Sequence, residues 1–228
     1  MKIINLAIFT LTDYFRRTWF YAEIILVAIL LFLFRDTYRL LGKNDIYPAL
    51  GMFSIVLSAV TVWRIASLET NPRIYILLTK AISRTSYPSG KILAAFSLNA
   101  LIVILLFIAG FFCTAVKEQL SFPNGLARLI PLGFILLMAN LIMLCCSSLV
   151  FSKLSFFWGI LLLILGTVQP FSSTGYLFPP IRQLIAGSYA SFDIHLIFSC
   201  LLALGYIVLF YFLALYFFKK RELNYEQK

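Results

Sequence analysis

Long apolar runs separated by short polar segments dominate the chain. Six runs approach or reach the ~20 residues that a helix needs to cross the ~30 Å hydrocarbon core of a bilayer. They lie near residues 19–34, 46–66, 92–116, 129–151, 154–170 and 194–218. Only Ser152 and Lys153 separate the fourth run from the fifth, so five spans are an alternative to six. The pattern predicts an all-α membrane protein with six transmembrane helices in one membrane domain, residues 1–228.

The segment before the first run has its own helical pattern. Apolar residues recur there at helical spacing, and the polar residues lie mostly elsewhere on the helix. The apolar positions are Ile4, Ala7, Ile8, Leu11, Tyr14 and Phe15. We expect residues 1–18 to form an amphipathic interface helix along the inner leaflet, the alternative being the cytoplasmic end of the first span.

The segment before the last run, residues 171–193, is too polar and too rich in Pro and Gly to span, yet it carries several apolar side chains. We expect a short re-entrant or external helical segment that dips into the outer leaflet. A plain external loop is the alternative.

The distribution of charge along the chain indicates its orientation in the membrane rather than a charged ligand. The sequence is 62% hydrophobic and 12% charged, with a formal net charge of +10. With the N-terminus inside, the cytoplasmic segments hold 13 of the 19 basic residues. This bias follows the positive-inside rule and predicts that both termini are cytoplasmic. We therefore expect an integral protein of a bacterial cytoplasmic (inner) membrane that binds membrane lipids and no nucleic acid.

Catalytic and metal-binding patterns are weak in this sequence. His195 stands beside Asp193 at the outer end of the last run, which is a single interfacial pair. Glu23 is the one ionisable candidate inside a run, and its place near the aromatic residues that begin the run favours a structural or interface role. No nucleotide-binding loop is present. We expect no enzymatic activity, no metal and no cofactor in this chain.

The polar segment 67–91 separates the second run from the third. Asn71 and Pro72 are suited to start a helix, and the apolar residues Ile74, Leu77, Leu78 and Ala81 follow at helical spacing. Pro88 and Gly90 predict a turn, with the third span beginning near Ile92. An interfacial loop whose basic residues contact lipid phosphates is the alternative.

This segment resembles the permease subunits of type-2 ABC exporters. In that family an acidic residue precedes a helix with a leucine pair, followed by Ser-Arg and by a Gly-Lys that opens the third span. The matching residues are Glu69, Leu77, Leu78, Ser83, Arg84, Gly90 and Lys91. The sequence departs from the family where a proline commonly precedes the Ser-Arg, since Ala81 and Ile82 stand there.

The resemblance implies a cytoplasmic coupling helix that docks on a separate ATP-binding subunit. The implied contact residues are Glu69, Arg73, Leu77, Leu78, Lys80, Arg84 and Lys91. Two such subunits would hold ATP and Mg and would drive two permeases, either a homodimer or a pair of related chains. The alternatives from the residues themselves are an ion-coupled secondary transporter, a membrane-embedded lipid-modifying enzyme and a subunit that only assembles with a transporter.

Overall fold

A computed structural model describes residues 2–16, 20–33, 41–67, 86–147, 155–168, 178–189 and 194–226. These residues form helices joined by turns and short coils, with no strand among them. The helices are α1 (Lys2–Arg16), α2 (Tyr21–Leu33), α3 (Lys43–Ser67), α5 (Ser86–Cys113), α6 (Val116–Gln119), α7 (Phe122–Ala127), α8 (Leu129–Cys145), α9 (Ser155–Val168), α10 (Ile181–Tyr189) and α11 (Ile194–Glu226). The predicted all-α class is confirmed.

Four helical segments are long and apolar enough to cross a membrane. They are Lys43–Ala66, Ser86–Cys113, Phe122–Cys145 and Ile194–Lys220. Two shorter apolar helices, α2 and α9, coincide with the first and fifth predicted runs. The segments of membrane-spanning length are therefore compatible with an integral membrane protein.

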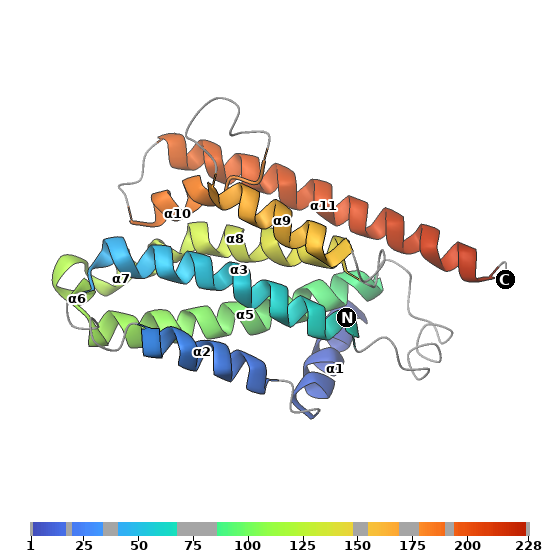
Figure 1. Ribbon diagram of the computed structural model, residues 1–228, viewed down its shortest axis with the longest axis horizontal. Coiled ribbons are helices and arrows are strands. Elements are labelled where there is room, and N and C mark those ends of the chain that lie inside the picture. The colour runs from blue at the N-terminus through green and yellow to red at the C-terminus, as the bar shows by residue number, and fades with distance from the viewer. Residues whose placement is uncertain are drawn as a thin grey trace.

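Helix α8 is the centre of the bundle. Apolar residues surround its whole circumference, so it can be buried on all sides rather than along one stripe. It packs against α3, α5, α9, α10 and α11. Helix α11, by contrast, lies at the edge and keeps a long apolar face exposed, including Leu201, Val208 and Phe212. In Figure 1, α6, α7 and α10 lie at one end of the bundle, and α1 and the C-terminus lie toward the other.

Helix α10 lies within residues 171–193 and is packed into the bundle. Its inner face, with Ile181 and Leu184, is fully buried, and it contacts α3, α8, α9 and α11. Glycines allow this close approach: a Cβ added at Gly51 of α3 would lie 2.8 Å from the Ile185 side chain. A Cβ added at Gly166 of α9 would lie 2.8 Å from the carbonyl oxygen of Pro179.

The prediction for the start of the third span was wrong. Helix α5 begins at Ser86, not near Ile92, and it includes both Pro88 and Gly90. Proline is tolerated in the first turn because its missing N–H would have no helical partner there. Gly90 allows a close helix contact instead of a turn, since a Cβ there would lie 2.7 Å from Leu6 of α1.

Other predicted boundaries also shift. Helices α6 and α7 occupy most of residues 117–128, which lie between the third and fourth predicted runs. The fourth run was predicted to extend to residue 151, but α8 ends at Cys145 and a turn follows at Cys146 and Ser147. The last helix runs eight residues past the predicted residue 218.

Replacement of Gly166 by alanine should destabilise the fold by about 1–3 kcal/mol, because the new methyl group would meet a backbone carbonyl that cannot rotate away. Gly205→Ala in α11 is the matched control, since nothing lies within 4 Å of a Cβ at that position. The control should be neutral or slightly stabilising, as alanine favours helix over glycine. Detergent-solubilised protein titrated with SDS and followed by circular dichroism measures both, and equal midpoints would contradict the assigned contact.

Candidate functional site

Four polar side chains meet inside the apolar bundle, each from a different helix. They are Glu23 of α2, Thr61 of α3, Asn99 of α5 and Asn140 of α8. Glu23 is 2% exposed and the other three are fully buried. Since unpaired polar groups are costly in an apolar interior, such groups are expected to satisfy one another. We call this set, together with Tyr14 of α1, the polar chain.

The polar chain is continuous at hydrogen-bond distance. The Thr61 Oγ1 atom lies 3.1 Å from Glu23 Oε1 and 2.9 Å from Asn99 Oδ1. The Asn99 Nδ2 atom lies 3.0 Å from Asn140 Oδ1. From the other side, the Tyr14 hydroxyl donates to Glu23 Oε1. Five helices are thus connected through one carboxylate oxygen and its neighbours.

Hydrogen counting fixes the direction of these bonds. The Thr61 hydroxyl has one hydrogen and cannot donate to both Glu23 and Asn99. The Asn140 Nδ2 atom is buried without an acceptor in the same orientation of the amides. Exchange of nitrogen and oxygen in the Asn99 and Asn140 amides removes the double donation by Thr61, and it leaves the Asn140 oxygen, an acceptor, at the buried position that has no partner among the described residues. Asn140 then donates to Asn99, Asn99 to Thr61 and Thr61 to Glu23, so every donor points toward the carboxylate.

Tyr14 remains a donor to Glu23 over the physiological pH range. Burial raises the pKa of Tyr14 far above its ordinary value, and the hydrogen bond and the charge of Glu23 act in the same direction. Arg64 opposes this shift but does not cancel it. A tyrosine that stays protonated contacts Glu23 as a hydrogen-bond donor, and this bond links α1 to α2.

The second carboxylate oxygen of Glu23 has no hydrogen-bond partner in the described part of the chain. Ser58, which lies one turn before Thr61 on α3, is also fully buried, and its hydroxyl has no partner within the ranges that the structure describes. The hydrogen bonds that lead to Glu23 Oε1 therefore all have an assigned direction, whereas Glu23 Oε2 lacks a donor among the described residues. This arrangement positions helices; it contains no nucleophile paired with a base.

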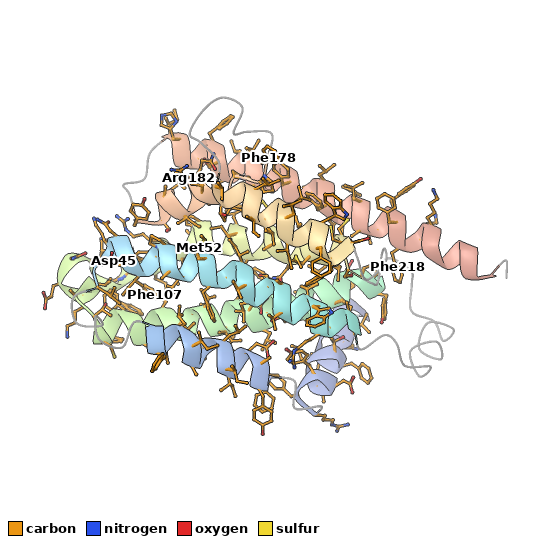
Figure 2. All side chains as sticks on the ribbon, in the orientation of Figure 1. Asp45, Met52, Phe107, Phe178, Arg182 and Phe218 are labelled. Atoms are coloured by element: carbon orange, nitrogen blue, oxygen red, sulfur yellow. The ribbon has the colours of Figure 1, made fainter. Side chains whose placement is uncertain are left out.

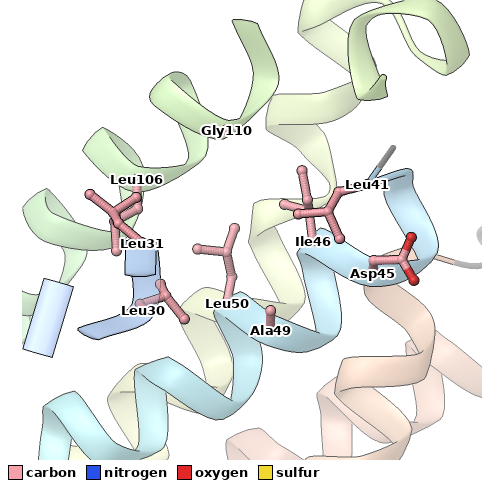
Figure 3. A pocket seen from close by; sticks show the side chains of 9 residues that line it. All are labelled: Leu30, Leu31, Leu41, Asp45, Ile46, Ala49, Leu50, Leu106 and Gly110. Carbon is pink, nitrogen blue, oxygen red and sulfur yellow. The ribbon is translucent and has the colours of Figure 1, made fainter. Parts of the chain in front are cut away.

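Two concave regions lie outside the polar chain. A groove of about 350 Å³ runs between α3 and α9 and is lined only by apolar side chains, with Trp63 and Phe156 in ring contact at 5.9 Å. A pocket of about 40 Å³ lies between α2, α3 and α5, and Asp45 is the one charged residue in its lining (Figure 3). The Asp45 carboxylate accepts the Gly42 N–H at 3.0 Å, so it caps the start of α3.

The predicted docking residues are almost all outside the described residues. Glu69, Arg73, Leu77, Leu78, Lys80 and Arg84 belong to the stretch 68–85. Lys91 lies in α5, where it is 5% exposed and its Nζ atom is 5.4 Å from the centre of the Tyr87 ring. Lys91 thus contacts its own chain in the first turns of α5.

The predicted pair at the outer end of the last run is described only in part. His195 is exposed in the first turn of α11, and its predicted neighbour Asp193 is outside the described residues. Asp45, Phe107 and Arg182 lie toward the end occupied by α6, α7 and α10, and Phe218 lies toward the C-terminal end (Figure 2). Within the described ranges, no group of three or more His, Cys, Asp or Glu residues is arranged to hold a metal ion.

The sequence analysis missed Thr61, Asn99 and Asn140. Each is an uncharged polar residue inside an apolar run, and such residues carry no charge signal that marks them out. An asparagine at mid-run is itself a usable signal, because a buried amide requires a partner on another helix.

No family model, no curated protein sequence and no solved structure matches this chain. The class of protein that the fold defines is an α-helical bundle with helices of membrane-spanning length and a buried polar chain.

Replacement of Thr61 by valine should destabilise the bundle by about 1–3 kcal/mol, because valine keeps the shape but removes both the donor to Glu23 and the acceptor for Asn99. Thr167→Val in α9 is the matched control, since the Thr167 hydroxyl donates to the Ile164 carbonyl of its own helix, at 2.7 Å. The control should change stability by less than about 0.5 kcal/mol. The midpoint of SDS-induced unfolding measures both, and equal midpoints would mean that the polar chain contributes nothing.

Proposed function

We propose that this chain is the permease subunit of an ATP-driven exporter, working as a pair of permeases with two ATP-binding subunits. The observation that supports this proposal is the position of α3 and α5, the two helices that flank the predicted docking stretch in the chain. Helix α3 ends and α5 begins toward the end of the bundle where the termini lie (Figure 1). A partner bound to residues 68–85 would act directly on two helices that both pack against α8.

The exposed apolar surface is consistent with a second permease and with lipid as neighbours. Helix α11 is largely uncovered, and the outer face of α1 carries Ile4, Ile8 and Phe15, each about half exposed. In the proposed complex, ATP-driven closure of the two ATP-binding subunits tilts the bundles, and substrate moves between them. ATP and Mg are bound by the partner, and the permease itself supplies the path.

Ion-coupled secondary transport is a second candidate, favoured by one observation. The Glu23 Oε2 atom is buried without a partner among the described residues, and carboxylates inside membrane bundles commonly serve ion pathways. Transport that needs an ion gradient, needs no ATP and is lost in Glu23→Gln would support this candidate over the exporter.

Introduction of charge into the docking stretch should abolish recruitment of the ATP-binding subunit. We expect Leu77→Asp and Arg84→Glu each to reduce the co-purified ATP-binding subunit more than about tenfold, because an apolar anchor and a rim charge are lost. Affinity purification of the tagged permease from its own host, with quantitative mass spectrometry, measures this ratio.

The matched controls make the same chemical changes at the opposite end of the bundle. Leu126 of α7 is 46% exposed and Lys117 of α6 is exposed, so Leu126→Asp and Lys117→Glu should leave recruitment unchanged. Full recruitment in both docking variants would refute the docking assignment. Absence of any ATP-binding subunit from the wild-type preparation would refute the exporter itself.

A further inference from the structure

The N-terminal helix α1 packs along α5 and also contacts α2. Near its start, the Leu6 side chain lies against Gly90 of α5 so closely that a Cβ at Gly90 would be 2.7 Å from Leu6 Cδ2. Near its end, Tyr14 donates to Glu23 of α2. Leu6 and Tyr14 are eight residues apart, which is about 12 Å along a helix. They share one buried stripe with Thr10, so both contacts belong to the same helix face.

The first contact is made with a crowded part of the bundle. Gly90 is in the first turns of α5, directly after the stretch 68–85. Tyr87 in the same turns is 2% exposed and stacks on Phe218 of α11, with ring centres 5.7 Å apart. The Ser89 hydroxyl lies 2.9 Å from the Tyr211 hydroxyl of the same helix. The start of α5 is therefore enclosed by α1 on one side and α11 on another, and a shift of these turns would displace α1.

The second contact leads into the polar chain. The Glu23 Oε1 atom accepts from Tyr14 and from Thr61, and Thr61 continues to Asn99 and Asn140. Removal of Tyr14 takes away one of the two hydroxyl donors of a carboxylate that is 2% exposed. A displacement of α1 would consequently change the balance of hydrogen bonds at the centre of the bundle.

We propose that α1 is a coupling element that transmits movement of the first turns of α5, through Tyr14, to Glu23 and the polar chain. The source of that movement, a partner acting on residues 68–85, rests on the proposed function. The mechanical link lies entirely within this chain and can be tested without a partner.

The test is a double-mutant cycle read by hydrogen exchange and mass spectrometry on the purified protein in detergent. Gly90→Val should push Leu6 away, and Tyr14→Phe should remove the donor without changing shape. We expect each variant to speed amide exchange in the first turns of α2, from Ile24 onward, by about tenfold, the effect of losing one hydrogen bond to a charged group. The double variant should exchange no faster than the faster single variant, because both changes break the same link.

Matched variants and peptides separate this link from general damage. Gly133→Val in α8 adds the same side chain where nothing lies within 4 Å of a Cβ, and it should leave α1 and α2 unchanged. Exchange in α10 (Ile181–Tyr189), which carries no residue of the polar chain, should stay constant in every variant. If Gly90→Val does not fold, Leu6→Ala removes the same contact without adding volume.

Two results would overturn the proposal. One is unchanged α2 exchange in Gly90→Val or in Leu6→Ala, and the other is a double variant whose effect is the product of the two single effects. Addition of a co-purified ATP-binding subunit with ATP gives a separate arm. A change in α2 amide exchange that occurs in the wild type and is absent in Tyr14→Phe supports the link. Failure to find any such subunit refutes the proposed function, and the result of the double-mutant cycle is unaffected by it.

Discussion

A carboxylate buried among apolar helices needs hydrogen-bond donors. At Glu23 this requirement links five helices, because its donors and the residues bonded to them lie on different helices. A charged group inside a membrane-type bundle is stable only where partners replace its water, and removal of such a partner is far more damaging than its net contribution suggests. Tyr14 and Thr61 supply donors to a single oxygen. Because Thr61 has one hydrogen to give, Asn99 must donate to it, and Asn140 must donate to Asn99. The position of one side chain therefore sets the direction of four bonds.

The polar chain needs helices that approach closely, and small residues provide that approach. Between apolar helices in a lipid environment, close backbone contact replaces the hydrophobic driving force that water would supply. Gly159 of α9 lies against Met143 of α8, where an added Cβ would be 3.1 Å from the sulfur. Gly51, Gly90 and Gly166 play the same part at α10, α1 and the turn before α10. Close packing at glycines thus sets the distance between the helices, and the hydrogen bonds of the polar chain select their register.

The sequence predicted helices well and contacts poorly, for physical reasons. A long apolar run can satisfy its backbone in lipid only as a helix, so each of the six runs contains a helix in the structure. Pro88 and Gly90 were misread because proline is neutral in a first turn and glycine serves close packing as well as turns. Thr61, Asn99 and Asn140 give little local signal, since their partners lie on other helices far along the chain. The apolar spacing within residues 68–85 predicted a helix, and the resemblance to type-2 ABC permeases implied that it docks on an ATP-binding subunit; those residues are outside the described part of the chain.

The polar chain contains one carboxylate, which needs strong hydrogen bonds, and several weaker hydrogen bonds between uncharged side chains. This combination suits a bundle whose helices must move relative to one another. Hydrogen bonds between uncharged side chains in membrane bundles average about 0.6 kcal/mol and reach about 1.7. The links through Asn99 and Asn140 are therefore strong enough to select a register and weak enough to exchange partners. The Glu23 carboxylate, in contrast, cannot lose both hydroxyl donors without a large penalty. One of its two donors, Tyr14, comes from α1 at the edge of the bundle. Displacement of α1 therefore changes the hydrogen bonds of Glu23 at the centre of the bundle. A bundle that is driven from one end is expected to have this property.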